Sequence, residues 1–79
     1  MKEEIGFDDY LDCRNLTCPM PVLKTRNAIS KLSSGQVLKM AATDPGFIAD
    51  IDYWSARTGN SLLKSELDGS AHIFFIQKN

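Results

Sequence analysis

Hydrophobic and polar positions follow two different periods along this chain. In residues 10–13 they alternate, which predicts a short strand with Leu11 and Cys13 on the opposite side from Asp12, or shifted by a local bulge. In residues 19–33 the apolar positions recur at helical spacing, with Lys24 and Arg26 among the polar residues of the other side. The apolar face expected for this helix contains Val22, Leu23, Ala28, Ile29 and Leu32.

The second half of the chain shows the same change of period. Residues 36–43 form an almost continuous apolar run after Gly35, typical of a strand covered by helices. The turn Asp44-Pro45-Gly46 follows, and Asp44 is a plausible cap for an amphipathic helix over residues 46–57, stopped by Gly59. The apolar side expected for this second helix comprises Phe47, Ile48, Ile51, Trp54 and Thr58.

Two further strand-like runs complete the chain, over residues 61–66 and 71–77. Leu67-Asp68-Gly69-Ser70 joins them, and its Asp-Gly step is a strong hairpin signal. The element order is therefore βαβαββ. If both crossovers are right-handed and run in one direction along the sheet, both helices lie on the same face. We expect an α/β (α+β) two-layer sandwich with one exposed sheet face.

Length and charge narrow the class of protein. Seventy-nine residues with 43% hydrophobic and 24% charged side chains predict one globular domain over residues 1–79, with a core at about 8–78. A formal charge of −1 and a pI near 5.6 argue against binding nucleic acid through many phosphate contacts. The acidic start lacks the apolar stretch of a signal peptide, and no apolar run approaches the ~20 residues of a membrane span, so we expect a cytoplasmic protein.

The candidate chemistry rests on two cysteines, Cys13 and Cys18. We expect both to be free thiols, because a disulfide closing so short a loop gives little stabilisation and cytosolic thiols are kept reduced. Two cysteines and the distant His72 do not match the four-ligand spacing of a structural zinc site, so no metal is expected. His72 is interpreted as an ordinary residue of the last strand.

Cys18 lies in the run Cys18-Pro19-Met20-Pro21, where the first helix begins. A residue before proline avoids helical geometry, whereas proline itself is favoured at the first helical position, so Cys18 fits the N-cap. Alternatively the helix starts at Pro21 with Met20 as its cap. Either arrangement brings the sulfur close to unpaired N–H groups and the positive helix end, which favour the thiolate.

Residues that follow Cys18 support its assignment as a nucleophile. Lys24 and Arg26 add positive charge in the first two turns, and Pro19 and Pro21 stiffen the segment. The alternative interpretation is that Cys18 is a small buried hydrophobe at a helix start. Against it, the sequence contains no other set of residues that resembles a catalytic site or a phosphate-binding loop.

Leu11-Asp12, Leu16 and the Cys-Pro-x-Pro run at Cys18 together resemble the opening of the TusA-like (SirA/YedF/YeeD) family of sulfur carriers. The resemblance continues to residue 78. It includes Gly35-Gln36-Val37-Leu38, Asp44-Pro45-Gly46, Asp50-Ile51 and Asp68-Gly69. It implies a four-stranded mixed sheet with two helices on one face, like the C-terminal domain of translation initiation factor 3. It also implies that Cys18 accepts sulfane sulfur as a persulfide.

A carrier of this kind needs a donor, such as a cysteine desulfurase or another sulfurtransferase, and a sulfur-accepting protein. The resemblance implies transfer toward 2-thiouridine in tRNA, molybdenum cofactor synthesis or sulfur oxidation. Met20 replaces the acidic residue of the tRNA-thiolating members, so the acceptor is not fixed. We expect a monomer without a cofactor, with Met20, Lys24, Arg26 and Asp44 as candidate partner contacts.

Two alternatives belong to other functional classes. The first is a regulatory or interaction module in which the motif only starts a helix. The second is a redox sensor in which Cys13 pairs with Cys18. A simpler explanation of Cys13 is a partly buried cysteine at the end of a strand.

Overall fold

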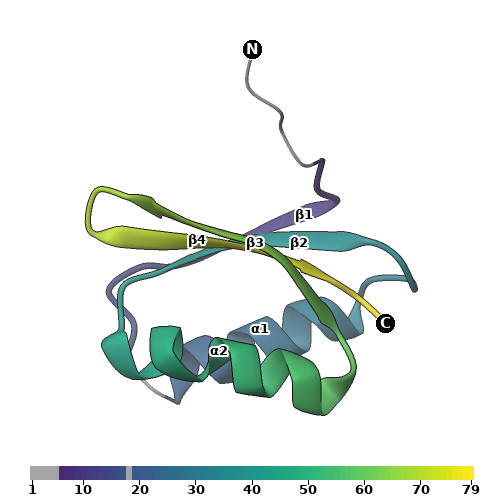
Figure 1. The fold of residues 1–79 in the computed structure, drawn as a ribbon, viewed down its shortest axis with the longest axis horizontal. Helices are drawn as coiled ribbons and strands as arrows, with labels where there is room; N and C mark the ends of the chain where they lie inside the picture. Colours follow the sequence, from purple (N-terminus) through teal and green to yellow (C-terminus); the bar gives the residue numbers. More distant parts are fainter. Residues whose placement is uncertain (1–5, 18) are drawn as a thin grey trace.

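A computed structural model describes residues 6–17 and 19–79. The elements follow the predicted order and are β1 (Asp9–Cys13), α1 (Met20–Ser30), β2 (Val37–Ala42), α2 (Pro45–Thr58), β3 (Ser61–Asp68) and β4 (Ala71–Gln77). The four strands form one mixed sheet, and both helices cover the same face of it (Figure 1). The predicted βαβαββ sandwich is confirmed.

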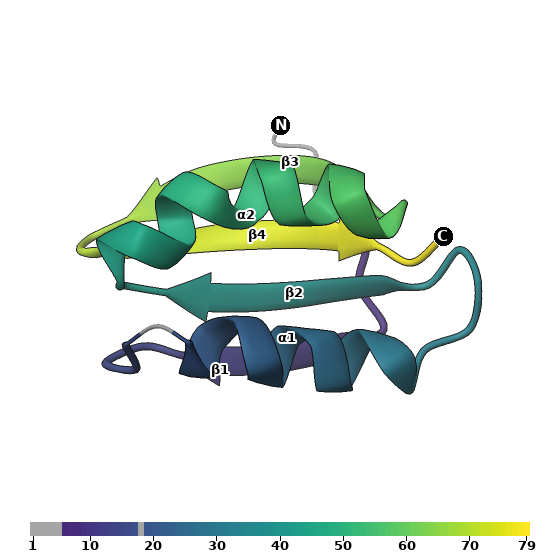
Figure 2. The same ribbon diagram turned by 90° about the horizontal axis from the view of Figure 1, so that it is seen from below.

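The strands are arranged in the order β1-β2-β4-β3. Strand β1 pairs with β2 in parallel, because the chain crosses over through α1, whereas β4 is antiparallel to both β2 and β3. The carboxyl ends of β1 and β2 therefore lie at the same end of the sheet, and α1 and α2 both begin at that end (Figure 2). This arrangement brings the β1–α1 and β2–α2 connections to the same end of the molecule.

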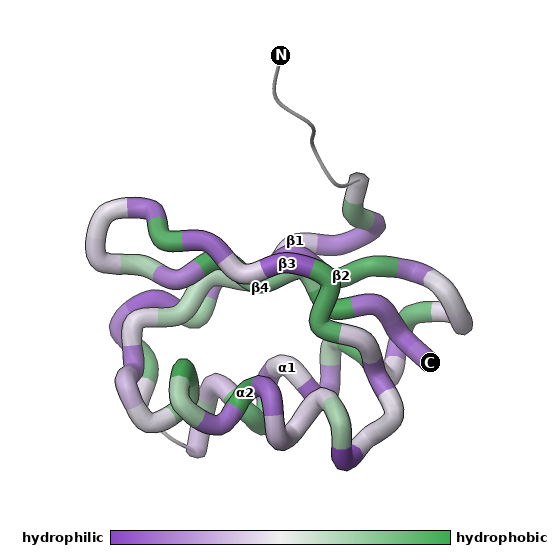
Figure 3. Tube along the Cα trace, viewed as in Figure 1, coloured by the Kyte–Doolittle hydropathy of each residue, from purple (hydrophilic) through white to green (hydrophobic). Residues whose placement is uncertain are grey.

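The main core lies between the sheet and the helices. Leu38 and Met40 of β2, Phe74 of β4 and Phe47 of α2 are each at most 2% exposed, and the rings of Phe47 and Phe74 meet edge to face at 6.1 Å. Each helix packs residues spaced four apart against this layer, and both helices contain hydrophilic as well as hydrophobic segments in Figure 3. The buried helix positions are Pro21, Thr25 and Ile29 in α1, and Phe47, Ile51 and Ser55 in α2.

No helix of the described residues 6–17 and 19–79 covers the opposite sheet face, yet its apolar residues are also buried. Val37, Ala41, Ala71, Ile73 and Phe75 form a second cluster there, each at most 8% exposed. Lys39 lies above them, with its Nζ 5.1 Å from the ring centroid of Phe7 and 5.6 Å from that of Phe75. Long side chains rather than a second layer therefore shield this face.

Several predicted details differ from the structure. Helix α1 ends at Ser30 rather than 33, and β3 extends to Asp68, so only Gly69 and Ser70 form the hairpin turn. Leu23, predicted to face the core, is 45% exposed, whereas the polar Thr25 is fully buried and donates its hydroxyl to the Met40 sulfur at 3.3 Å. Thr58, assigned to the apolar side of the second helix, is exposed.

Candidate functional site

The candidate site lies in the connection between β1 and α1. Cys18 belongs to this connection but is outside the described residues. Its described neighbours in sequence, Thr17 and Pro19, are both exposed. The connection therefore reaches the surface on each side of residue 18, at the end of the sheet where both helices begin.

The first half of this connection is fixed by hydrogen bonds. Asn15 adopts a left-handed backbone with φ of 69°, and its N–H donates to the hydroxyl of Thr43 at 2.9 Å. The N–H of Leu16 donates to the Cys13 carbonyl at 3.3 Å. Because Thr43 directly follows β2, the loop before residue 18 is attached to the end of the neighbouring strand.

The helix entrance differs from both predicted arrangements. Pro19 is the N-cap of α1, with φ −95° and ψ 7°, and Met20 is the first helical residue, so neither Cys18 nor Met20 is the cap. The N–H of Met20 donates to the Thr17 carbonyl at 3.0 Å, and that of Leu23 donates to Pro19. These two N–H groups are therefore not available to a sulfur atom, whereas the positive end of the α1 dipole still favours a thiolate at this end of the helix.

The two predicted supporting cations lie on α1. Lys24 and Arg26 are both exposed, and neither makes an ion pair with any residue of the described segments 6–17 and 19–79. Burial raises the pKa of the Cys13 thiol and the charge of Lys24 partly opposes this shift, so the field of Lys24 reaches the end of β1. As far as the described segments are concerned, both cations remain free to interact with a partner.

The two predicted contact residues have different environments. Met20 is 43% exposed at the start of α1, beside the loop that contains residue 18. Asp44 is the N-cap of α2, as the sequence predicts, and its Oδ2 accepts a hydrogen bond from the Phe47 N–H at 2.9 Å. The Asp44 carboxylate thus has a structural role as the cap of α2, whereas Met20 is an exposed apolar residue on the surface.

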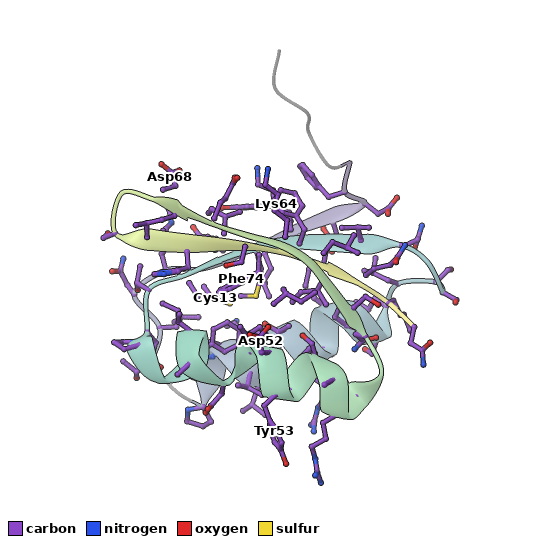
Figure 4. All side chains as sticks on the ribbon, viewed as in Figure 1. Cys13, Asp52, Tyr53, Lys64, Asp68 and Phe74 are labelled. Carbon is purple, nitrogen blue, oxygen red and sulfur yellow. The ribbon has the colours of Figure 1, made fainter. Side chains whose placement is uncertain are left out.

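Cys13 is a buried free thiol. It is fully buried as the last residue of β1, and its side chain lies between the sheet and the helices (Figure 4), in the same core cluster as Phe74. Burial raises the pKa of the Cys13 thiol, the Lys24 charge opposes this effect, and Asp12 adds to it. Thiolate is the nucleophilic form of cysteine, so Cys13 is poorly suited to sulfur chemistry.

One charged pair beside the loop was not predicted. Arg14 donates from Nε and Nη2 to the two carboxylate oxygens of Asp12, each at 2.9 Å. These hydrogen bonds lower the pKa of Asp12 to about 2. In the sequence, this ion pair could have been inferred from the opposite charges of Asp12 and Arg14, which are two positions apart at the end of the predicted strand. Both side chains are about half exposed, so the pair orders the loop surface without belonging to the core.

His72 is part of the sheet, as predicted. It lies opposite Ala42, and its ring stacks on Phe74 at 6.2 Å. Its Nδ1 is buried and has no hydrogen-bond partner in the described part of the chain. Residues 6–17 and 19–79 contain no cluster of three or more histidine, cysteine, aspartate or glutamate residues able to hold a metal ion. The helices of this region are too short and too polar to cross a bilayer.

Residues 9–78 match the model of the family described as sulfurtransferase TusA. The chain belongs to the TusA family of sulfur carriers. This membership agrees with the resemblance based on the Cys-Pro-x-Pro run and supports a role in sulfur transfer.

Individual TusA-family relatives show the same relationship. The chain is 42% identical over 73 residues to the sulfur carrier protein TusA of Allochromatium vinosum, covering 92% of this chain and 96% of that protein. It is 42% identical over 71 residues to the putative sulfur carrier protein YrkI of Bacillus subtilis, covering 90% and 95%. A putative sulfur carrier protein of Aquifex aeolicus is 43% identical over 76 residues, but this chain spans only 39% of its length.

Proposed function

We propose that this protein carries sulfane sulfur as a persulfide on Cys18, received from a cysteine desulfurase or another sulfurtransferase and passed to an acceptor protein. The observation that carries the proposal is the contrast between the two cysteines of a TusA-family chain. Cys13 is fully buried with a raised thiol pKa, so the sulfur chemistry falls to Cys18, whose described neighbours in sequence, Thr17 and Pro19, are exposed.

Loading of Cys18 is a thiol exchange that needs no external oxidant. The Cys18 thiolate attacks the outer sulfur of the donor's persulfide, the sulfur–sulfur bond of the donor breaks, and the donor cysteine leaves as a thiolate with the bonding electrons. The transferred sulfur keeps its proton, so atoms and charge balance. Delivery is the same exchange in reverse, with the acceptor thiolate as attacking group.

Two features of this chain support exchange at Cys18. The site is at the amino end of α1, where the helix dipole favours a thiolate. In addition, Pro19 and Pro21 restrict the backbone of the segment, so presenting it to a partner costs little conformational entropy. The exchange requires no cofactor. We further propose that the protein is a cytoplasmic monomer. We also propose that its acceptor protein belongs to tRNA thiolation, molybdenum cofactor synthesis or sulfur oxidation.

Mass spectrometry of the intact protein tests the proposal. After incubation with a cysteine desulfurase and L-cysteine, we expect a mass gain of one sulfur atom that is removed by a thiol reductant. Cys18→Ser should abolish this gain, whereas the matched control Cys13→Ala should keep it. Absence of the gain in the parent protein, both with the desulfurase and with inorganic polysulfide as the sulfur source, would refute the carrier role and favour a regulatory module. A loss of two protons that requires Cys13 would instead identify a redox sensor.

A further inference from the structure

The two outer strands of the sheet, β1 and β3, differ in how their free edges are protected. Each pairs with only one neighbour, so one side of its backbone meets no other strand of the described residues. In β1, which has five residues, the Asp9 carboxylate accepts the Tyr10 N–H at 2.9 Å. Within residues 6–17 and 19–79, no side chain forms a hydrogen bond with the backbone of β3, which has eight residues. The longer and less protected edge is therefore that of β3 (Figure 2).

Strand β3 also exposes two large apolar side chains. None of its eight residues is buried, and Leu63 and Leu67 are 42% and 66% exposed. An unpaired edge strand with exposed apolar side chains is a template for the addition of another strand. The register shift between Leu62 and Lys64 is a bulge, which limits the start of β3 as a pairing segment. The segment suited to pairing is therefore residues 63–67, which we call the β3 edge.

The charged residues of the β3 edge lie on the sheet face away from the helices. Lys64 lies opposite Phe75 of β4, a member of the second buried cluster, and Figure 4 shows the Lys64 side chain on this side. Glu66 lies opposite Ile73 of the same cluster. Within one chain the Lys64 Nζ is 3.2 Å from the Glu66 carboxylate, and the two side chains are 40% and 45% exposed. An exposed ion pair of this kind contributes little to stability, so either charge can exchange its partner for one on a second chain.

The β3 edge is complementary to itself. Two antiparallel copies are related by a two-fold axis, so that residue i of one chain faces residue j of the other and the reverse. With the axis at Ser65, Lys64 of each copy faces Glu66 of the other, at the Cβ separation of about 4.5–5.5 Å at which opposite charges stabilise a strand pair. The exposed Leu63 and Leu67 face each other in the same register. An axis at Lys64 or at Glu66 would instead bring two like charges opposite each other, so the charges favour the register centred on Ser65.

We propose that the β3 edge pairs antiparallel with the β3 edge of a second copy of this chain, giving one continuous sheet across the two copies. The inference goes beyond the proposed function and does not depend on it. Because the strand order is β1-β2-β4-β3, the connection between β1 and α1 lies at the other edge of the sheet, outside this interface. One pair of edge strands buries less than the ~1,200 Å² of a standard stable interface, so the association is transient and the monomer prevails in dilute solution.

Charge reversal tests this pairing, because the register predicts which variants should bind each other. Lys64→Glu gives the β3 edge two acidic residues, and Glu66→Lys gives it two lysines. Each variant alone should self-associate about tenfold more weakly than the parent in sedimentation equilibrium, since the symmetric pair contains the lost contact twice. An equimolar mixture of the two variants should associate at least as strongly as the parent, because acidic edges then pair with basic ones. The double exchange Lys64→Glu/Glu66→Lys should restore self-association to the parent level.

A control variant and a second measurement complete the test. Lys31→Glu makes the same change of net charge as Lys64→Glu at an exposed position after α1, and it should self-associate like the parent. All substituted side chains are at least partly exposed, so the variants should fold as the parent does. Raising the parent to about 1 mM should shift the amide resonances of Ser65 and Leu67 but not those of β1. A parent that does not self-associate at this concentration, a control weakened as much as Lys64→Glu, or a mixture that binds no better than its separate variants would overturn the proposal.

Discussion

Asp44 offers a direct test of whether a conspicuous loop carboxylate serves folding or partner binding. Its backbone is extended, with φ −75° and ψ 119°, and its carboxylate accepts the Phe47 N–H at 2.9 Å while its carbonyl accepts the Ile48 N–H at 3.0 Å. This is the geometry of an N-cap. Asp44→Ala removes the side-chain acceptor, whereas Asp44→Asn keeps an acceptor and removes only the charge.

The expected loss for Asp44→Ala follows from this geometry. Removing an N-cap acceptor costs about 1 kcal/mol, within a range of about 0.5–2 kcal/mol. Unfolding entropy of about 2.1 cal/mol/K per residue gives about 170 cal/mol/K for this domain, so about 1 kcal/mol lowers the Tm by about 6 °C. Asparagine caps a helix as well as aspartate, and the lost charge costs about 0.3–1 kcal/mol, so Asp44→Asn should lower the Tm by about 2–6 °C. Asp44→Ala loses the charge in addition to the acceptor, so its Tm should fall further than that of Asp44→Asn.

Thermal unfolding followed by circular dichroism measures both shifts, and sulfur loading below the Tm measures function. If Asp44 only caps α2, both variants should accept sulfur from a cysteine desulfurase at the parent rate. An unchanged Tm for Asp44→Ala would refute the capping argument. An Asp44→Asn protein that keeps most of its stability but is loaded several times more slowly would show that the carboxylate contacts the donor.

Two further predictions concern charges outside the helices. The Lys39 Nζ lies 5.1 Å from the Phe7 ring centroid, so a double-mutant cycle of Lys39→Met and Phe7→Leu in denaturant unfolding should give a coupling energy of about 0.5–1 kcal/mol, and additive effects would contradict this contact. Nuclear magnetic resonance titration should give an Asp12 pKa of about 2, returning toward 3.8 in Arg14→Gln. Because folding lowers the pKa of Asp12, the pair stabilises the folded protein at pH values above 3.8, the pKa of the unfolded state, and this stabilisation is lost as the pH falls toward about 2. An Asp12 pKa that is unchanged in Arg14→Gln would refute the pairing.

The parts of the fold that could be predicted from sequence depend on local chemistry. The Asp68-Gly69 step predicted a hairpin, and Gly69 adopts φ of 63° in the turn. Asp44 before Pro45 predicted the start of α2, and Gly59 with φ of 79° ends it. Each of these signals acts between residues adjacent or a few positions apart, so the pattern of residue types contains the information.

The orientation of α1 was predicted less accurately because its buried stripe includes a polar residue. Thr25 lies between Pro21 and Ile29 on the inner side, where the Met40 sulfur accepts its hydroxyl. A pattern that counts only apolar residues replaces Thr25 with Leu23 and rotates the expected face. The error matters for function, since it hides the exposure of Leu23 beside the candidate site.

Contacts between distant segments could not be predicted from periodicity. The bond from the Asn15 N–H to the Thr43 hydroxyl joins residues 28 positions apart, and the strand order β1-β2-β4-β3 depends on which edges pair. Crossover handedness places the helices on one face but does not choose a neighbour for β4. The attachment of the loop before residue 18 to the end of β2 is therefore a property of the tertiary structure alone.

The difference between the two thiols follows from strand parity. Side chains alternate along β1, so Leu11 and Cys13 share the helix-facing side and Asp12 lies on the other, and pairing of Cys13 with Ala42 fixes this register. A shift of one residue would bring Cys13 to the open face. The register thus makes Cys13 a buried thiol with a raised pKa, so a persulfide on this protein is expected on Cys18.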